Sequence, residues 1–337
     1  MPILQNEHTY VVATRCFTYN HSSYILDTLS GFVKQETSFP VVYIIVDDAS
    51  TDGEQDVLRQ WAETHLECTE APSIWRNEYY GDLAVAPLKG NNLSKYVIIL
   101  LSENHYQHGK SLKRFDYISK WFDDAKYQAL CEGDDYWSDG KKLQKQVDLM
   151  EKFTDVGMCY TKCQYFFQDK EEFSKNAWGG RSERFEDLIK ENTVPTPSVL
   201  YRQGLQQLYD AEIIPQERGW LLGDYPFWLW LSKEAGVKFM DEVTCVYRVL
   251  EHSASQRDNK DKRVAFVTSV ISIQQFFADR YGQGYLVKKD KLERALLMDS
   301  FSNKDYKRVI RCYQTIKKPG LKATLKYLIS LLLARRG

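Results

Sequence analysis

The sequence predicts an α/β fold in which a mixed, mostly parallel β-sheet is covered by helices on both faces. In the first 140 residues, strand-like runs alternate with segments of helical spacing, and the strand-like runs are continuously apolar. A strand that is apolar along its whole length is buried on both faces, as in a parallel sheet. Three of the four runs end in polar clusters, and ligands of such sheets bind at the carboxyl ends of the strands. The pattern therefore predicts one polar site built from distant parts of the chain.

The elements of the first half follow in a regular order. Strands are predicted at 10–18, 41–46, 97–101 and 127–131. The intervening helices are placed by apolar spacing at Ile25, Leu29, Phe32 and Val33, at Val57, Leu58 and Trp61, and over 112–122. Residues 70–95 show no periodicity and are predicted to be irregular.

The order changes after residue 140. A helix is predicted over 143–153, an aromatic strand over 156–167, a proline-containing loop over 192–198 and a short strand over 199–201. An intensely aromatic segment follows at 220–231, then a last strand at 243–249. The spacing predicts helices from 264–281 onward.

Charge and composition limit the classes of partner. The 337 residues carry 45 Lys and Arg against 46 Asp and Glu, a net charge of −1, so no global field attracts a polyanion and no nucleic-acid partner is predicted. The seven cysteines form no C-x-x-C pair, which predicts reduced, buried thiols in a cytoplasmic protein. Neither a signal peptide nor a membrane-spanning run is recognisable.

Two acidic clusters follow predicted strands. Glu132, Asp134 and Asp135 place three carboxylates in four residues, which is electrostatically costly without a hard cation such as Mg²⁺ or Mn²⁺. Capping of the next helix is the alternative explanation. Asp47 and Asp48 end the second strand, where a carboxylate can accept hydrogen bonds from ribose or a base, or form a solvated turn. Neither glycine-rich phosphate motif is present.

Three motifs together carry a resemblance to a known family. They are Phe17-Thr18-Tyr19-Asn20, the segment from Val46 to Gly53 (VDDASTDG), and the segment from Cys131 to Trp137 (CEGDDYW) with 142–147 behind it. In this order the chain resembles the bacterial family 2 glycosyltransferases, which have the GT-A nucleotide-diphospho-sugar transferase fold. The resemblance covers about residues 8–255. It implies a GT-A domain over 1–255, with a nucleotide-binding half near 8–140 and an acceptor half near 141–255, and a helical C-terminal extension over 256–337.

The implied reaction moves a sugar, with inversion, from a nucleotide-diphosphate sugar to a hydroxyl group. The resemblance implies that Asp48 binds the nucleoside with Asp47 beside it, while Tyr19 stacks near the base. Asn20 is placed with Tyr19 at the nucleotide, and Asn104 reaches the nucleotide from the segment before the metal site.

The same resemblance implies a divalent ion, Mn²⁺ or Mg²⁺, at the second acidic cluster. Asp134 is expected to bind the metal, with Asp135 as a second ligand, and His252, from a later loop, is expected to bind the metal or a phosphate. Glu132 stands where the family has its first Asp, so it is expected to contact ribose or a metal-bound water. Arg248 is expected to contact the diphosphate.

The general base implied by the resemblance is Asp224, with Gly223 in place of the family's Glu. Capping of a helix that begins here is the alternative role, since Pro226 suits a first turn. Ser198 is expected to line the acceptor pocket, whereas His105 and His108 are predicted to be surface residues.

At the C-terminal end, Leu321, Leu325, Leu328 and Leu332 share one helical face. Residues 320–337 could lie on an anionic membrane surface or dock on the domain or on a partner chain, which includes a homo-oligomer. The leading interpretation is a cytoplasmic enzyme, peripheral at the membrane, that transfers sugar from a UDP-linked donor to a glycan or lipid-linked acceptor in surface polysaccharide or lipopolysaccharide synthesis. A nucleotidyltransferase and a non-catalytic sugar- or nucleotide-binding module are the alternatives.

Overall fold

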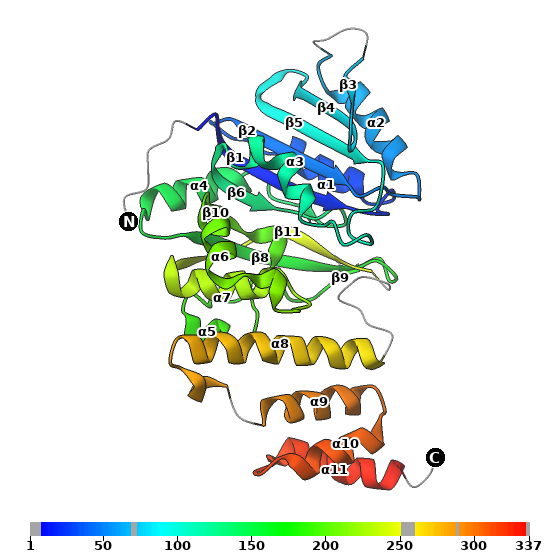
Figure 1. Cartoon of the computed structure of the whole chain (residues 1–337), viewed down its shortest axis with the longest axis vertical. Coiled ribbons are helices and arrows are strands. Elements are labelled where there is room, and N and C mark those ends of the chain that lie inside the picture. Colours follow the sequence, from blue (N-terminus) through cyan, green and yellow to red (C-terminus); the bar gives the residue numbers. More distant parts are fainter. Residues whose placement is uncertain (1–7, 69–72, 251–259, 288–289, 335–337) are drawn as a thin grey trace. The chain divides into compact units, whose positions relative to one another are not determined.

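The computed structural model describes residues 8–68, 73–250, 260–287 and 290–334 (Figure 1). The chain divides into two compact units. Unit 1 comprises Met1–Glu183, Thr193–Leu208 and Leu231–Val249. Unit 2 comprises Arg184–Asn192, Tyr209–Trp230 and Leu250–Gly337. The predicted division at residue 255 stays a prediction.

The centre of unit 1 is a set of four parallel strands. They are ordered β5 (Asn91–Leu101), β2 (Val41–Asp47), β1 (Tyr10–Thr18) and β6 (Ala125–Leu130), and Thr14 of β1 lies beside Tyr43 of β2 and Ala129 of β6. Because these strands are parallel, their carboxyl ends meet at one edge of the sheet. This is the arrangement that the continuous apolar runs predict.

Mostly antiparallel pairings extend the sheet on both sides, so that the fold is mixed. Beyond β5 come β4 (Gly81–Leu88) and β3 (Trp75–Glu78). Beyond β6 come β10 (Leu200–Arg202), β8 (Met158–Phe167), β11 (Val237–Val249) and β7 (Tyr136–Trp137), and β9 (Glu172–Phe173) pairs with β8. Of these additional pairs, β8 and β11 are parallel.

The expectation that residues 70–95 are irregular is wrong, because β3 and β4 form a hairpin there. The residues of β3, Trp-Arg-Asn-Glu, are half-buried or exposed, so this edge strand lacks the apolar run that marks the central strands. The bend between the two strands depends on Gly81, whose φ is +144°, and a Cβ there would lie 1.9 Å from the carbonyl oxygen of Leu100.

Helices cover both faces of the parallel strands, as predicted. In β2, Val41, Tyr43 and Ile45 face one side, and Val42, Ile44 and Val46 face the other. The first side packs against α1 (Ile25–Val33), α2 (Glu54–His65) and α4 (Lys142–Lys152), and the second packs against α3 (Lys113–Phe122).

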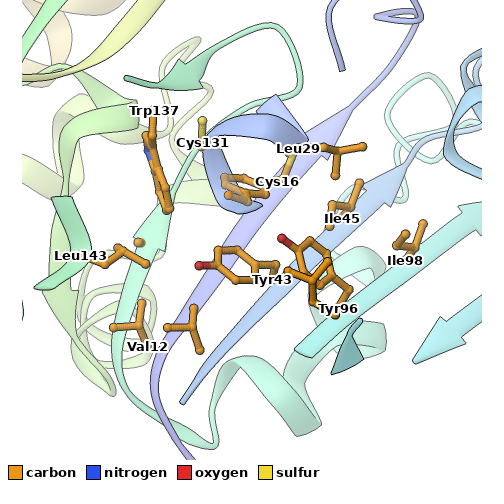
Figure 2. Close-up of a cluster of buried hydrophobic side chains, with 14 of the residues drawn as sticks. Val12, Cys16, Leu29, Tyr43, Ile45, Tyr96, Ile98, Cys131, Trp137 and Leu143 are labelled. Atoms are coloured by element: carbon orange, nitrogen blue, oxygen red, sulfur yellow. The ribbon is translucent and has the colours of Figure 1, made fainter. Parts of the chain in front are cut away.

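The larger core cluster contains aromatic rings and thiols side by side (Figure 2). The rings of Tyr43 and Tyr96 stack with their centroids 4.9 Å apart. Burial raises the pKa of the Cys16 and Cys131 thiols well above the ordinary value, so both remain protonated and unreactive. Five of the seven cysteines are buried, as predicted, and no two of the seven are joined by a disulfide.

Unit 2 is helical. It contains α5 (Phe185–Leu188), α8 (Lys260–Arg280), α9 (Lys291–Ser302), α10 (Tyr306–Thr315) and α11 (Leu321–Leu333). Two further helices, α6 (Leu205–Ile213) and α7 (Asp224–Glu234), contribute to both units. Short 3₁₀ turns lie at Thr196–Ser198, Pro215–Glu217 and Gly284–Leu286. None of the described helices combines the length and the apolar character that crossing a bilayer requires.

The aromatic segment at the start of α7 forms core. Tyr225, Phe227, Trp228 and Trp230 are each at most 3% exposed. The Tyr225 hydroxyl donates to the carbonyl of Leu188 at 2.8 Å and accepts a hydrogen bond from Gln274 Nε2 at 3.0 Å. These rings therefore fill unit 2 and do not present a face to a sugar.

Candidate functional site

The ends of β1 and β2 are held together by one buried carboxylate, Glu54, at the start of α2. Its Oε1 accepts a hydrogen bond from the Thr18 hydroxyl at 2.5 Å, and its Oε2 accepts from the backbone N–H of His21 at 2.8 Å and the Ser50 hydroxyl at 2.9 Å. Burial raises the pKa of Glu54 even though these donors act to lower it. Glu54 thus fixes the loop after β1 against the loop after β2.

Asp48 connects the same edge of the sheet to the loop after β5. Its Oδ1 accepts from the backbone N–H of His105 at 2.7 Å, and its Oδ2 accepts from the N–H of Tyr106 at 3.0 Å. The guanidinium of Arg114 lies 3.3 Å from Oδ2 and also covers the ring of Phe17. Asp48 is only 1% exposed, so in this conformation it positions the 105–106 loop. Its predicted contact with a nucleoside stays a prediction.

Asp47 and Asn20 shape the turn between these loops. Asp47 Oδ1 accepts from the backbone N–H of Ser50 at 3.0 Å and from Gln55 Nε2 at 2.6 Å, and the carboxylate is fully buried. Asn20 has a positive φ of 58°, and its side-chain oxygen accepts from the N–H of Thr51 at 2.8 Å. Both residues therefore hold the backbone at this edge of the sheet. We call this edge, formed by the loops after β1, β2, β5 and β6, the rim.

Tyr19 and Asn104 are both hydrogen-bonded to Gln107. Asn104 Oδ1 accepts from the backbone N–H of Gln107 at 2.7 Å, and the Gln107 side chain reaches the Tyr19 hydroxyl at 3.4 Å. Tyr19 is half-buried, while Tyr106, the residue before Gln107, is 74% exposed. The structure thus brings the predicted nucleoside residues into one hydrogen-bonded rim.

The expectation that His105 is a surface residue is wrong, since it is 2% exposed. Its ring nitrogens lie 3.0 Å from the carbonyl of Glu103 and 3.1 Å from the Tyr117 hydroxyl. His108 is exposed, as predicted. The two histidines are three residues apart in a non-helical loop, so their spacing gives no information about which of them points inward.

The acidic loop after β6 packs tightly against the end of β1. A Cβ on Gly133 would lie 2.0 Å from the Thr18 hydroxyl oxygen, so only glycine fits there without movement. The Thr28 hydroxyl lies 2.6 Å from the carbonyl oxygen of Asp135. His21 Nε2 lies 3.9 Å from Asp134 Oδ2, which joins the loop after β1 to the predicted metal ligand.

The electrostatics of this loop show an excess of negative charge. Burial, with Asp134 adding to it, raises the pKa of Glu132 to about 7, although Arg15 and Arg114 oppose the shift. Burial and the neighbouring Asp134 also raise the pKa of Asp135 well above its ordinary value. Such groups are stabilised in their ionised form when a cation lies between them.

The donor set fits a hard divalent ion, because carboxylate oxygens are the ligands that Mn²⁺ and Mg²⁺ take. In the described part of the chain, no three acidic, histidine or cysteine side chains are already arranged around one point. Asp134 is half-buried and reaches the surface, whereas Asp135 is 3% exposed. Asp134 is therefore the better-placed first ligand, and water, the diphosphate or a further side chain would complete the coordination.

Arg248 supports the acidic loop from behind. Its backbone N–H donates to Asp135 Oδ1 at 2.9 Å, and its Nε donates to the carbonyl of Asp134 at 2.9 Å. The remaining guanidinium nitrogens reach Gln168 Oε1 at 2.5 Å and Asp27 Oδ2 at 2.7 Å. Arg248 is 4% exposed, so these contacts make it a positioning residue in this conformation.

Three further predicted residues are Asp224, Ser198 and His252. Asp224 begins α7 in unit 2, and its Oδ1 accepts from the N–H of Tyr225 at 2.6 Å. Ser198, expected in the acceptor pocket, is fully buried and donates to the carbonyl of Pro195 at 2.6 Å. His252 lies outside the described residues.

Four residues of the rim were not predicted from the sequence: His21, Glu54, His105 and Arg114. Glu54 carried one available signal, since it stands at the start of a predicted helix after the polar turn that ends the second strand. Arg114 carried none, because a single arginine in the first turn of a helix is ordinary. Its importance follows from the fold, which brings it to Asp48 across 66 residues of sequence.

The chain is similar to known proteins in sequence and in fold. Residues 17–80 match the model of the glycosyl transferase family 2. The chain is 28% identical over 254 residues to an uncharacterized protein of Mycobacterium tuberculosis, which covers 73% of this chain but only 61% of that relative. It is 24% identical over 265 residues to TuaG of Bacillus subtilis, covering 77% of this chain and 87% of TuaG. The name of TuaG assigns it provisionally to teichuronic acid biosynthesis as a glycosyltransferase.

Among solved structures, the mannosyltransferase PcManGT of Pyrobaculum calidifontis, in complex with GDP-Man and Mn²⁺, is similar with a TM-score of 0.51 and 15% identity. The match covers 97% of this chain and 81% of that protein. These findings confirm the predicted resemblance to family 2 glycosyltransferases and the GT-A type of fold, and they support the predicted enzyme class.

Proposed function

We propose that this chain, which shares the family 2 glycosyltransferase signature and a GT-A type of fold, is a metal-dependent inverting glycosyltransferase. Its donor is a nucleotide-diphosphate sugar, with UDP as the expected nucleotide, and its acceptor is a hydroxyl of a glycan or a lipid-linked glycan. The observation that carries the proposal is the rim itself. Glu54, Asp48 and the His21–Asp134 contact draw the loops after β1, β2, β5 and β6 to one edge of the sheet.

The chemistry follows from the groups available. The acceptor oxygen attacks the anomeric carbon as the bond to the diphosphate breaks, and the nucleoside diphosphate leaves with the bonding electrons. Asp134 and Asp135 would hold a divalent ion, which when bound would supply positive charge for the departing diphosphate. Asp224 takes the proton from the acceptor hydroxyl. A nearly neutral protein needs such a local charge, since its net charge is −1.

The biological setting belongs to the same proposal. The name of TuaG supports surface polysaccharide synthesis as the setting, and the Mn²⁺ and GDP-Man in the PcManGT structure support a metal and a nucleotide sugar. The enzyme would act at the cytoplasmic side of the membrane, where nucleotide sugars are made.

The test incubates the protein with Mn²⁺ and a panel of nucleotide sugars and measures release of nucleoside diphosphate. Asp134→Ala should abolish Mn²⁺-dependent stabilisation by UDP, whereas Asp148→Ala, an exposed residue of α4, should leave it intact. No release with any donor, combined with no heat stabilisation by UDP, would contradict the proposal. Stabilisation by UDP without turnover would favour a non-catalytic binding module.

The role of Asp224 can be separated from helix capping. Asparagine caps a helix about as well as aspartate, so Asp224→Asn should keep the fold and UDP binding but remove transfer. Loss of UDP binding together with a lower melting temperature would assign Asp224 to structure instead. Gly223→Glu restores the acidic pair of the family, and the structure has nothing within 4 Å of a Cβ at that position.

A further inference from the structure

The last described helix, α11, leaves four leucines on one of its faces exposed. Leu321, Leu325, Leu328 and Leu332 are 88%, 57%, 51% and 69% exposed. At roughly 100° per residue they lie within about 60° of one another on the helix surface. An apolar stripe of this kind on a protein surface marks a binding face.

The opposite side of α11 accounts for its packing in unit 2. Ala323 and Ser330 are buried, and Tyr327 stacks on Tyr313 of α10 with ring centroids 4.1 Å apart. The hydroxyls of Thr324 and Tyr313 lie 3.0 Å apart, and Lys326 Nζ lies 3.8 Å from the ring centre of Phe301 in α9. Small and aromatic residues therefore attach the helix to unit 2. The four exposed leucines take no part in this packing and are available to contact another surface.

The segment that contains this stripe is strongly positive in charge. Residues 304–337 contain ten Lys and Arg and one Asp, a net charge of +9, whereas the whole chain has −1 and the other 303 residues therefore carry −10. The cations with exposed side chains are Lys304, Lys307, Arg311, Lys317, Lys318 and Lys322. Within the described part of the chain, none of these six forms an ion pair.

We propose that α11 and the basic segment around it form a docking surface for an anionic lipid bilayer, with the leucine stripe inserted among the lipids. The stripe supplies apolar burial and the flanking lysines supply attraction to anionic headgroups, which is the combination that interfacial helices use. A second copy of the chain is a poor partner for this surface. Pairing two leucine stripes would bring together two segments that each carry a net charge of +9, and these would repel each other. The inference does not depend on the proposed sugar transfer.

The test is co-sedimentation of the full chain, without donor or metal, with vesicles of phosphatidylcholine or of an equal mixture of phosphatidylcholine and phosphatidylglycerol. Binding is expected only to the anionic vesicles and should weaken as salt is added. The double variant Leu325→Glu/Leu328→Glu should lower the affinity about tenfold or more. Leu208→Glu, which changes a leucine of α6 with 53% exposure, should not.

Charge is tested separately. Lys317→Glu/Lys318→Glu should weaken binding to the anionic vesicles about tenfold, and Lys34→Glu/Lys175→Glu, two exposed lysines of unit 1, should leave it unchanged. Equal binding to both kinds of vesicle, or binding that survives the double leucine change, would overturn the proposal. So would a dimer in sedimentation analysis that the leucine change dissolves, since a second copy would then cover the stripe. Melting temperatures that match the wild type show that the variants are folded.

Discussion

Single buried carboxylates connect the loops of the candidate site. Glu54 accepts hydrogen bonds from the Thr18 and Ser50 hydroxyls and from the His21 N–H, and Asp48 accepts from two backbone N–H groups and pairs with Arg114. Glu54 contacts a residue 33 positions away in sequence, and Asp48 contacts residues 57 and 66 positions away. The geometry of the rim therefore depends on residues that need not touch a substrate.

Removing the Glu54 carboxylate is expected to lower the stability of the folded chain. Glu54→Ala leaves two hydroxyls and a backbone N–H without their acceptor, so unfolding free energy should fall by about 2–4 kcal/mol. Urea denaturation measures the change. Glu63→Ala in the same helix, at an exposed position, should change stability by less than about 0.5 kcal/mol. Equal effects of the two substitutions would contradict the role given to Glu54.

Lys142 gives a pH-dependent prediction. It is fully buried, its Nζ donates to Gln146 Oε1 at 2.7 Å and lies 4.4 Å from the ring centre of Trp137, and burial lowers its pKa to about 8. The unfolded chain, with a lysine pKa of about 10.4, binds more protons than the folded chain between pH 8 and 10. Lys142 therefore contributes a rise in unfolding free energy with pH across this window.

Lys142→Met should remove that rise, which is roughly 3 kcal/mol between pH 7 and 10.5. The measurement is urea denaturation of the wild type and the variant at several pH values. Lys152→Met, an exposed lysine of the same helix, should keep the wild-type slope. Parallel pH profiles for the wild type and Lys142→Met would show that the buried amine does not titrate as inferred.

At the scale of elements, the acidic loop depends on how closely it approaches β1. Gly133 has no space for a Cβ, because Thr18 is held in place by Glu54. Arg248, on β11, holds the other side of the same loop through Asp134 and Asp135. The loop is thus fixed between strands from distant parts of the sheet, so its carboxylates have defined positions before any ligand binds.

Gly133→Ala is expected to displace this loop. The added methyl group would lie 2.0 Å from the Thr18 hydroxyl oxygen, so stability should fall by about 1–3 kcal/mol and Mn²⁺-dependent stabilisation by UDP should weaken. Denaturation and thermal-shift titrations measure the two effects. The control is Gly180→Ala, where a Cβ meets nothing within 4 Å. If Gly133→Ala behaves like this control, the loop is not constrained by Thr18.

At the scale of the whole molecule, the two units differ in how they are assembled. Unit 1 is organised around the parallel strands, whereas unit 2 gathers α5 and the start of α7 with the helices after residue 260. Trp220 packs on Phe276 of α8 with ring centroids 5.3 Å apart, and the Leu221 N–H donates to the Ser269 hydroxyl. The helical C-terminal part therefore shares a core with the segment that contains Asp224.

Truncation tests this arrangement. A chain ending at residue 255 loses α8 and exposes Tyr225 and its neighbours, so its melting temperature should fall by about 10 °C or more. A chain ending at residue 319 lacks α11 but keeps α8, so its melting temperature should fall by much less. An unchanged melting temperature for 1–255 would establish it as an independent domain, as the sequence-based division predicts.

The sequence by itself determined the parallel core, the positions of its strands along the chain and the family resemblance. Continuous apolar runs at 10–18 and 41–46 can be buried only on both faces, and polar residues that follow such strands must meet at one edge. Periodicity also located α1, α3 and α4 closely. It could not locate β3, because an exposed edge strand has no apolar pattern to recognise.

Only the tertiary structure decided which polar residues face one another. It buried Asp47, Ser198 and His105, engaged the guanidinium of Arg248, and brought Glu54 and Arg114 into the rim. It also decided that α11 packs through its own residues Ala323, Tyr327 and Ser330. The leucines at 321, 325, 328 and 332 are left exposed. The reason is physical. Whether a segment is buried can be predicted from the local periodicity of its apolar residues. Which groups form a hydrogen bond depends on their proximity in space, and the sequence alone does not show that proximity.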